Sequence, residues 1–600
     1  MALETNSNSI FFSYMGLFIR FAQWRLALLI FLIFIGTFME LLGVVTLLPL
    51  LQLSLGEDLN NPISQKVLAT ISNLGFSTSF ASLALIISAI FIFKALVSFA
   101  QNYWTIRTIA LVRHSLQSSL ARGLEQARYE FYLEQKTGYL ANLMTVESAR
   151  FAASLRIFSR IIVSLVYSLI YIPTIIVLEM EISLIIVVVG LLAFLVARPL
   201  IRHTKALSMD VSDKTASLSS EMVQFVESFD YLKATANSRR VRQHVLKRVN
   251  DLADRQIRMG RRTAALGAIK EPLAVLSLLG YIFYNVEMLS SSMASTVVIA
   301  LIMYRVLSHV LTLPLAIQRL HQLIGGVHYI SNFSREIWKA HECNGSIVID
   351  SLNDDIIFQN VSLHRKKHHI LKGINLTIPY HKSVAIVGES GAGKTTIFRL
   401  LTRLIVPDEG SITIGEHNFS DLNNEAFRSR LGYVTQDPMI LNDTIATNLT
   451  LRLGPNQKEN NIEKMKEAAR AAHCHDFIEA LPQKYMTQVG ERGASLSGGE
   501  RQRIAIAREL YKDPDILIFD EATNALDAET DKIVQASIEK LHGKRTIVVI
   551  AHRLSSVAKC DHIYVMAAGR ILESGSFKNL YENRGSFFRK MWDHQVADTK

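Results

Sequence analysis

Residues 388–395 read Gly-Glu-Ser-Gly-Ala-Gly-Lys-Thr, directly after the apolar run Ser383–Val387 and directly before the helical pattern Thr396–Leu401. This G-x-x-x-x-G-K-[ST] pattern between a strand and a helix is typical of a loop whose backbone N–H groups enclose phosphate oxygens. The dipole of the following helix attracts negative charge to the same place. The segment therefore predicts an α/β domain that holds a nucleotide by its phosphates.

Two carboxylates extend this prediction from binding to hydrolysis. The apolar run Ile516–Phe519 ends in Asp520 and Glu521. We expect Lys394 to neutralise the β and γ oxygens, and Thr395 and Asp520 to bind Mg²⁺. Glu521 is placed to accept a proton from the attacking water. The residues expected to contact the nucleotide in this loop are Gly388, Ser390, Gly391, Gly393, Lys394, Thr395 and Thr396. These features fit many nucleotide hydrolases that use ATP and Mg²⁺.

The segment Leu496-Ser497-Gly498-Gly499-Glu500, followed by Arg501-Gln502-Arg503, distinguishes among these hydrolases. Here the sequence resembles the ATP-binding cassette (ABC) transporters, and the resemblance covers the chain from about residue 10. The motif of that family ends in Gln, and Glu500 is a common variant of it. The resemblance implies that Ser497, Gly498 and Gly499 close over the γ-phosphate held by a second subunit.

Other stretches match further motifs of the same family. The resemblance implies that Gln436, in Val434–Asp437, binds Mg²⁺ or water, and that His552 contacts the γ-phosphate. It also implies that Ala525–Asp527 couples the two ATP sites. The stretch Thr487–Gly493 resembles an element that precedes the signature motif in exporters.

One position departs from the family pattern. An aromatic side chain usually stacks on adenine just after the first strand of the cassette, but this chain has Val361–Arg365 there, followed by His368 and His369. Arg365 or a histidine is able to stack on the base. The alternative is that adenine packs on aliphatic atoms alone, and the sequence leaves both open.

The first half of the chain has the composition of a membrane domain. The whole chain of 600 residues has 49% hydrophobic residues, 20% charged residues and a formal net charge of +11. A membrane helix needs about 20 mostly apolar residues. Six segments meet this requirement: approximately 26–53, 83–104, 157–178, 182–201, 264–287 and 294–318.

The distribution of basic residues predicts the orientation of these helices. The segment 56–81 contains Lys66 as its single basic residue, whereas 105–156 and 202–263 are rich in Arg and Lys. The positive-inside rule then places both long segments and both termini in the cytosol, and the net charge does not point to nucleic acid. We expect both segments to continue the spanning helices, with short turns near Gly138 and Asp230 that resemble the coupling helices of exporters.

The predicted fold class is multidomain: an all-α six-helix transmembrane domain with long cytosolic helical extensions, followed by an α/β P-loop ATPase domain. The predicted domains are an interfacial elbow helix at 1–25, the transmembrane domain at 26–325, a linker at 326–345 and the nucleotide-binding domain at 346–600. Cys343, Cys474 and Cys560 have neither paired nor metal-ligand spacing, and we interpret them as free thiols.

Charged side chains inside predicted spans are costly and are therefore candidate functional groups. Glu40 is in the first span, Lys94 in the second, and Arg305 and His309 share one face of the sixth. One interpretation is a Glu40–Lys94 ion pair with an arginine that reaches the membrane surface. The other is a net positive, water-filled cavity for an anionic head group.

The resemblance implies an ATP-hydrolysis-driven exporter or flippase of a lipid-like or amphipathic substrate. With one cassette per chain, it implies a dimer, and the intact motifs favour two identical copies in a bacterial inner membrane. A weak similarity of Met39–Pro49 to flippases of lipid-linked oligosaccharides adds to this expectation. Alternatives are a multidrug or peptide exporter, an ATP-gated channel or regulator, and a soluble cassette protein, which the six spans disfavour.

Overall fold

The computed structural model describes residues 24–57, 59, 61–288, 292–365, 368–451, 462–520, 535–536, 538–551 and 554–597. The chain forms two compact units. The first comprises Met1–Ala127 and Phe131–His341, and the second comprises Arg128–Glu130 and Glu342–Lys600. Each unit has hydrophobic clusters of its own. The expected elbow helix at 1–25 lies outside the described residues except for Trp24 and Arg25, which begin α2.

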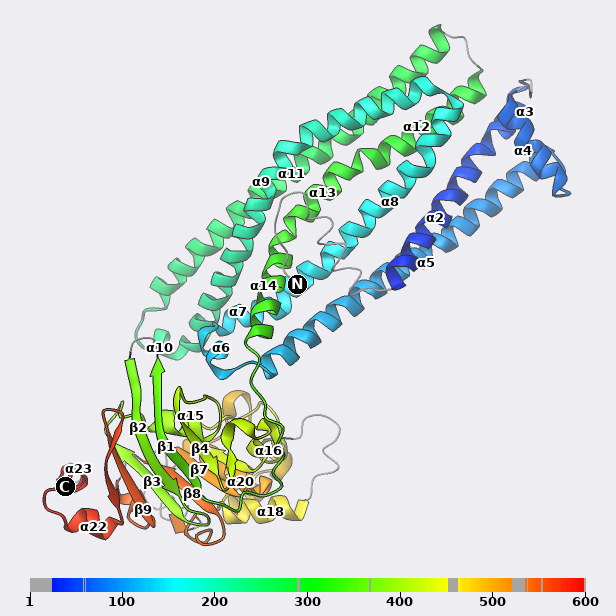
Figure 1. Ribbon diagram of the computed structural model, residues 1–600. Helices are drawn as coiled ribbons and strands as arrows, with labels where there is room; N and C mark the ends of the chain where they lie inside the picture. Colours follow the sequence, from blue (N-terminus) through cyan, green and yellow to red (C-terminus); the bar gives the residue numbers. More distant parts are fainter. Residues whose placement is uncertain are drawn as a thin grey trace. The chain divides into compact units, whose positions relative to one another are not determined.

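The described part of the first unit is entirely helical (Figure 1). Helix α2 packs along α5, and α9 packs along α11. The helices are α2 (Trp24–Val45), α3 (Leu47–Leu55), α4 (Pro62–Asn73), α5 (Phe80–Glu125), α6 (Tyr129–Glu134), α7 (Thr137–Asn142), the π-helix η1 (Leu143–Glu147), α8 (Ser148–Leu178), α9 (Met180–Glu227), α10 (Phe229–Ala234), α11 (Ser238–Phe283), the π-helix η2 (Tyr284–Met288), α12 (Met293–Val310), α13 (Thr312–Gln322) and α14 (Ile324–Lys339).

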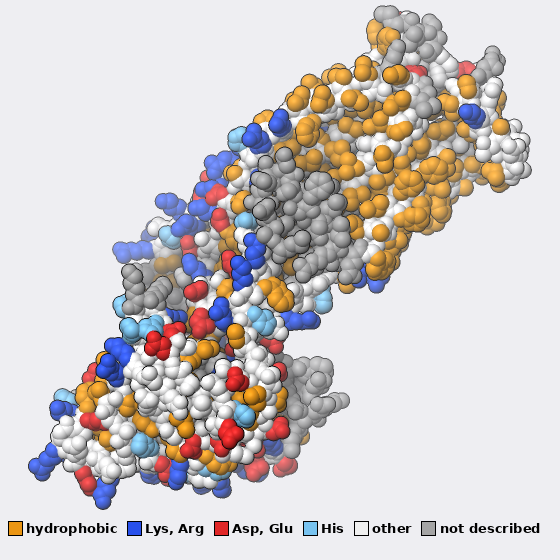
Figure 2. All heavy atoms as spheres, in the orientation of Figure 1, with side chains coloured by type: hydrophobic (Ala, Val, Ile, Leu, Met, Phe, Trp, Pro, Cys, Tyr) orange, Lys and Arg blue, Asp and Glu red, His pale blue; other side chains and the backbone are white. Residues whose placement is uncertain are grey.

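Six helical stretches are long and apolar enough to cross a membrane: Trp24–Leu55, Phe80–Glu125, Thr137–Ile176, Ser183–Glu227, Ser238–Glu287 and Met293–Gln322. In their most apolar windows, between 11% and 50% of the residues are buried inside the protein, so many apolar side chains face outward. Figure 2 shows these side chains covering one end of the helical unit. A helix that is apolar on its outward face requires lipid around it. This confirms the predicted six-helix membrane domain.

The longest helices continue well beyond the thickness of a bilayer. Helix α9 has 48 residues, and α5 and α11 have 46 each. At 1.5 Å per residue each is roughly 70 Å long, whereas the hydrocarbon core of a bilayer is about 30 Å thick. The helical extensions predicted from the sequence are therefore present.

Two short helices stand where the sequence predicts turns between the extensions. Helix α7 contains Gly138, and α10 contains Asp230. A Cβ atom added to Gly138 would lie 2.4 Å from the backbone Cα of Ser220 in α9. The backbones of α7 and α9 therefore approach each other as closely as glycine allows, which fixes α7 against the long helix.

We expect Gly138→Ala to lower the thermal unfolding temperature of the detergent-solubilised protein by several degrees, because the methyl group must displace backbone. Gly260→Ala in α11 is the matched control, since no atom lies within 4 Å of its added Cβ. Replacing that helical glycine with alanine should stabilise the helix by up to about 1 kcal/mol, because alanine has the higher helix propensity. A Gly138→Ala variant as stable as Gly260→Ala would contradict the close approach.

The second unit contains two sheets. A four-stranded antiparallel sheet has the order β2-β1-β4-β5, and a six-stranded sheet has the order β10-β9-β3-β8-β7-β6. In the larger sheet only the β10 pairing is antiparallel. The strands are β1 (Ile356–Arg365), β2 (His368–Ile378), β3 (Ser383–Gly388), β4 (Glu409–Ile414), β5 (His417–Asn418), β6 (Leu431–Val434), β7 (Ile516–Asp520), β8 (Thr546–Ile550), β9 (His562–Ala567) and β10 (Arg570–Gly575).

Helices accompany these strands, as expected for an α/β domain. They are α15 (Lys394–Leu401), α16 (Asn424–Ser429), α17 (Ile445–Thr450), α18 (Ile462–Ala471), α19 (His475–Ala480), α20 (Gly498–Lys512), α22 (Phe577–Glu582) and α23 (Phe587–Ala597). All six residues of β3 are buried, so the strand that precedes the phosphate loop is rigidly held. Helix α14 occupies most of the stretch 326–345 that the sequence predicts to be a linker, and it packs on α8 and α9.

Candidate nucleotide-binding site

The parallel strands bring the predicted motifs to one edge of the larger sheet. Ile386 of β3 is opposite Ile550 of β8, and Ile550 is opposite Asp520 of β7. Phe519 of β7 is in turn opposite Val434 of β6. Because parallel strands end at the same edge, the segments after β3, β8, β7 and β6 all begin there. They are the segments that contain the phosphate loop, His552, Glu521 and Gln436.

The phosphate loop connects the end of β3 to the start of α15. Gly388 has φ +151°, and an added Cβ would lie 2.2 Å from the carbonyl oxygen of Met566. Gly393 has φ +105° at the N-cap of α15, a conformation that side chains other than glycine rarely adopt. These two glycines let the chain turn sharply from a buried strand into a helix whose N-terminus, with its favourable dipole, suits an anion.

Lys394 places a positive charge in the phosphate loop. Its side chain is buried, and Nζ donates hydrogen bonds to the carbonyl oxygens of Gly388 at 2.7 Å and Glu389 at 3.0 Å. The ammonium group therefore lies beside the backbone that would enclose phosphate. Ser390, Gly391 and Thr395 are exposed, so their polar atoms are accessible to a ligand.

Tyr433 connects three parts of the site, although it belongs to none of the motifs recognised in the sequence. Its hydroxyl donates to Oδ2 of Asp520 at 3.3 Å, and its ring stacks on Phe398 of α15 with centroids 4.1 Å apart. Its backbone N–H donates to Glu509 of α20 at 3.2 Å. Burial and the neighbouring charge of Asp520 raise the pKa of Tyr433, so the hydroxyl stays protonated and able to donate. The feature of the sequence that could have indicated this role is the position of a tyrosine in the strand just before Gln436.

Burial also acts on Glu509. It raises the pKa of this carboxyl, while Lys512, the Tyr433 N–H and Arg508 act in the opposite direction. Glu509 and Lys512 lie in α20, the helix that begins at the signature motif. The strand β6 and the signature helix are therefore held together by a partly buried polar contact next to the Asp520 strand.

The signature motif forms the N-terminus of α20. Ser497 is exposed at the N-cap, and its backbone N–H and hydroxyl both donate to Oε2 of Glu500, at 2.7 and 2.8 Å. The N–H of Glu500 donates back to the Ser497 hydroxyl at 3.3 Å. This capping box fixes the start of the helix. Glu500, where the family motif has Gln, therefore orients Ser497, and Gly498 and Gly499 follow in the first turn.

The remaining predicted residues are only partly described. Gln436 is exposed in the segment after β6, and the neighbouring Thr435 carbonyl accepts from the side chain of Gln502 in α20 at 3.1 Å. Thr396 is half-buried in α15. Glu521, His552 and the stretch Ala525–Asp527 lie outside the described residues.

Arg365 is exposed at the end of β1, where it pairs with His368 of β2. The imidazole rings of His364 and His369 lie 4.2 Å apart beside it, and Nδ1 of His364 is 3.3 Å from Asp408. Planar side chains are thus available at this hairpin to stack on a base.

The donors at the sheet edge fit magnesium. Mg²⁺ prefers hard oxygen ligands in octahedral geometry and usually combines one or two carboxylates with phosphate oxygens and water. Thr395, Asp520 and Gln436 supply a hydroxyl, a carboxylate and an amide oxygen. Among the described residues no group of three or more His, Cys, Asp or Glu side chains is arranged to hold a metal. A single carboxylate shared with nucleotide phosphates is the arrangement that these residues can provide.

We expect Tyr433→Phe to raise the Mg²⁺ concentration needed for half-maximal nucleotide binding by about three- to tenfold, the value of one hydrogen bond. Phenylalanine keeps the stacking on Phe398 but leaves the Asp520 carboxylate less firmly oriented. Nucleotide binding without Mg²⁺ should not change, and Mn²⁺ binding followed by electron paramagnetic resonance should weaken.

Tyr380→Phe is the control for this variant, because the Tyr380 hydroxyl donates to Asn353 at 3.3 Å and touches none of the site residues named here. Equal Mg²⁺ dependence of the two variants would show that Tyr433 only fills space.

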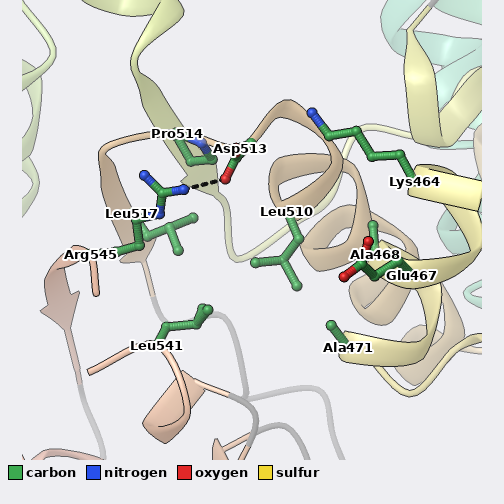
Figure 3. Close-up of a pocket in the computed structure, with 10 residues that line it drawn as sticks. All are labelled: Lys464, Glu467, Ala468, Ala471, Leu510, Asp513, Pro514, Leu517, Leu541 and Arg545. Carbon is green, nitrogen blue, oxygen red and sulfur yellow. Dashed lines mark hydrogen bonds and ion pairs between the residues drawn. The ribbon is translucent and has the colours of Figure 1, made fainter. Parts of the chain in front are cut away.

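The described residues of the second unit line pockets at either end of the larger sheet's strands. One of 440 Å³ adjoins the phosphate loop and is lined by Gly388, Glu389, Phe587, Lys590, Met591, His594 and Gln595. The other, of 280 Å³, lies among α18, the end of α20 and the start of β7 (Figure 3). There, Arg545 forms an ion pair with Asp513. Because Asp513 and Pro514 precede β7, this second pocket is at the opposite end of that strand from Asp520.

Comparison with known proteins gives two family matches. Residues 26–315 match the ABC transporter transmembrane region, and residues 371–524 match the ABC transporter family. The heterocyst differentiation ATP-binding protein HepA of Nostoc is 30% identical over 484 residues, which cover 80% of this chain and 78% of that protein. A structure of a bacterial Atm1-family ABC exporter with ATP bound has a TM-score of 0.78 at 25% identity, over 96% of this chain and 99% of that one.

Two further relatives match over shorter lengths. The ATP-dependent lipid A-core flippase of Methylococcus capsulatus is 44% identical over 249 residues, which are 40% of each chain. Multidrug resistance protein 1 of Entamoeba histolytica is 40% identical over 245 residues, which are 40% of this chain and 19% of that longer protein.

Proposed function

Because this chain belongs to the ABC transporters, with a transmembrane region and an ATP-hydrolysing domain in one polypeptide, we propose that two copies export or flip a lipid-like or amphipathic substrate. The observation that carries the proposal is the union, in one chain, of six membrane-length helices and a phosphate loop followed by an exposed signature motif. An ATPase that lacks membrane-spanning helices would have no element through which to move a substrate across the membrane.

A second copy is needed to complete each ATP site. Strand β6, on which α20 packs, is separated from β3 by β7 and β8. That distance is three strand spacings, roughly 14 Å. Ser497 is exposed at the start of α20, so this helix N-terminus is accessible to the nucleotide of another copy. The motifs of this cassette are intact, which favours a homodimer.

In the proposed reaction, the N–H groups of the phosphate loop and Lys394 bind the β- and γ-phosphates. Mg²⁺ held by Thr395, Gln436 and Asp520 would supply charge neutralisation at the transferring phosphoryl group. Tyr433 orients Asp520. Glu521 takes the proton of the attacking water, and His552 and the partner's Ser497 stabilise the charge on the γ-phosphate. Arg365 stacks on the adenine.

Transport would follow from closure of the two cassettes around two ATP molecules. The helical extensions α5, α9 and α11 carry this movement into the membrane. The basic residues of the extensions support a cytosolic position for the cassettes and both termini. Export across a bacterial inner membrane, by alternating access, then requires the outer side to open in the ATP-bound state.

The name of the lipid A-core flippase relative supports a lipid substrate, whereas the multidrug resistance relative supports the alternative of a drug or peptide exporter. The test is ATP hydrolysis by the protein in proteoliposomes, measured with a panel of lipids, lipid-linked glycans, peptides and drugs. We expect stimulation by lipids or lipid-linked glycans. Stimulation by drugs or peptides alone would favour the alternative, and ATP-gated ion conductance without substrate-stimulated hydrolysis would favour a channel.

A further inference from the structure

A cluster of charged and aromatic side chains joins four of the membrane helices. Glu40 of α2 is 1% exposed, and its Oε2 lies 2.6 Å from Nζ of Lys94 in α5. The hydroxyl of Tyr167 in α8 donates to the same oxygen. Nε of Arg305 in α12 lies 3.2 Å from Oε1. All four residues are in the membrane-length stretches.

The charges in this cluster do not balance. One carboxylate faces two cations, so the cluster of Glu40, Lys94 and Arg305 has a net charge of +1. An uncompensated charge inside a membrane domain is costly and is usually matched by a partner. The ion pair with Lys94 that the sequence suggested is present, but Arg305 also contacts Glu40 instead of reaching only toward the membrane surface.

Arg305 is the cation whose charge Glu40 neutralises least. Oε2 of Glu40 is occupied by Lys94 and Tyr167, and the contact of Arg305 with Oε1 is an ion pair without hydrogen-bond alignment. A guanidinium has five N–H donors, and the contact of Arg305 with the carboxylate is made through Nε. Its side chain is 41% exposed, compared with 24% for Lys94. A second anion therefore has access to it.

The surroundings suit a ligand with a polar head and an apolar tail. The ring centroid of Phe91 in α5 lies 5.8 Å from Nζ of Lys94, so apolar surface adjoins the charged groups. On the inner side, Tyr167 stacks against His309 with ring centroids 3.8 Å apart. The planar N–H fork of arginine matches the paired oxygens of a phosphate.

We infer that the Glu40–Lys94–Arg305 cluster binds the phosphate-bearing head group of the transported lipid, with Arg305 as the main contact. Lys94 neutralises Glu40, and Glu40 and Tyr167 hold both cations in place from the buried side. The inference rests on the proposed function for the identity of the ligand as substrate. The binding step itself requires neither ATP nor transport.

The test is equilibrium binding of a fluorescent dialkyl phosphate to the purified dimer in detergent without ATP, with phosphatidylcholine of equal chain length as the neutral competitor. We expect Arg305→Gln to weaken binding of the dialkyl phosphate about tenfold. Arg305→Lys keeps the positive charge but loses the planar pair of N–H donors. Its affinity for the dialkyl phosphate should lie between those of Arg305→Gln and the unmodified protein. Glu40→Gln, in preparations that remain dimeric, should bind at least as tightly as the unmodified protein.

Arg319→Gln is the matched control, because it removes the same charge from α13, about 20 Å further along the helical path, and should leave binding unchanged. Wild-type affinity in Arg305→Gln would overturn the inference. Competition by inorganic phosphate at the same concentration as the lipid would overturn the assignment to a lipid. If the protein binds the dialkyl phosphate through Arg305 but transports no lipid, the proposed function is refuted and the binding site is not.

Discussion

The Glu521→Gln variant is expected to bind ATP with the affinity of the unmodified protein and to lose nearly all hydrolysis. Glutamine cannot accept the proton of the attacking water, and removal of a general base typically costs 10²- to 10⁴-fold in rate. The substitution leaves Asp520 and its hydrogen bond from the Tyr433 hydroxyl unchanged, so the expected Mg²⁺ ligand is retained. The ATP-bound dimer should therefore accumulate with the cassettes closed.

Three measurements check this expectation: the ATPase rate, the amount of ATP retained after gel filtration, and cross-linking between cysteines introduced on the two cassettes. Glu479→Gln is the control, because Glu479 pairs with Lys484 on the surface of the same unit, at 2.7 Å. It makes the same chemical change and should hydrolyse ATP at the normal rate. Unchanged turnover in Glu521→Gln would mean that another group accepts the proton.

The sequence predicts the fold well because both halves carry strong local signals. Six apolar stretches with basic segments between alternate pairs define the helical unit, and the apolar runs at 383–387, 431–434, 516–519 and 546–550 appear as neighbouring parallel strands. The position of the phosphate loop at a strand end follows from the motif itself. In each case residues close together in the chain determine the structure.

Contacts between distant segments are what the sequence does not reveal. Tyr433 is 87 residues from Asp520, and nothing in the pattern of β6 indicates that its hydroxyl reaches that carboxylate. The pairing of Arg305 with Glu40 depends on how α12 packs beside α2, which apolar periodicity does not define. Glu500 is different, because its capping box with Ser497 is a local pattern that the sequence could have predicted.

Mixed dimers of two inactive variants are expected to regain one working ATP site. Lys394→Met removes the charge in the phosphate loop. Ser497→Asp keeps an N-cap for α20 but places a carboxylate where the γ-phosphate would approach. Each homodimer should retain about 1% of the hydrolysis or less, since loss of one such contact typically costs 10²- to 10³-fold. In a mixed dimer, one site loses both groups and the other keeps both.

This outcome arises only if Lys394 and Ser497 of one ATP site come from different copies. Each variant carries a different affinity tag, and sequential purification isolates the mixed dimer, whose ATP occupancy should be about half that of the unmodified protein. The decisive control pairs the double variant with an unmodified chain. Shared sites leave that dimer without a complete site, because each site lacks one group, whereas sites built within a single chain leave one site intact. Hydrolysis by this control, and none by the mixed dimer, would show that each chain works alone.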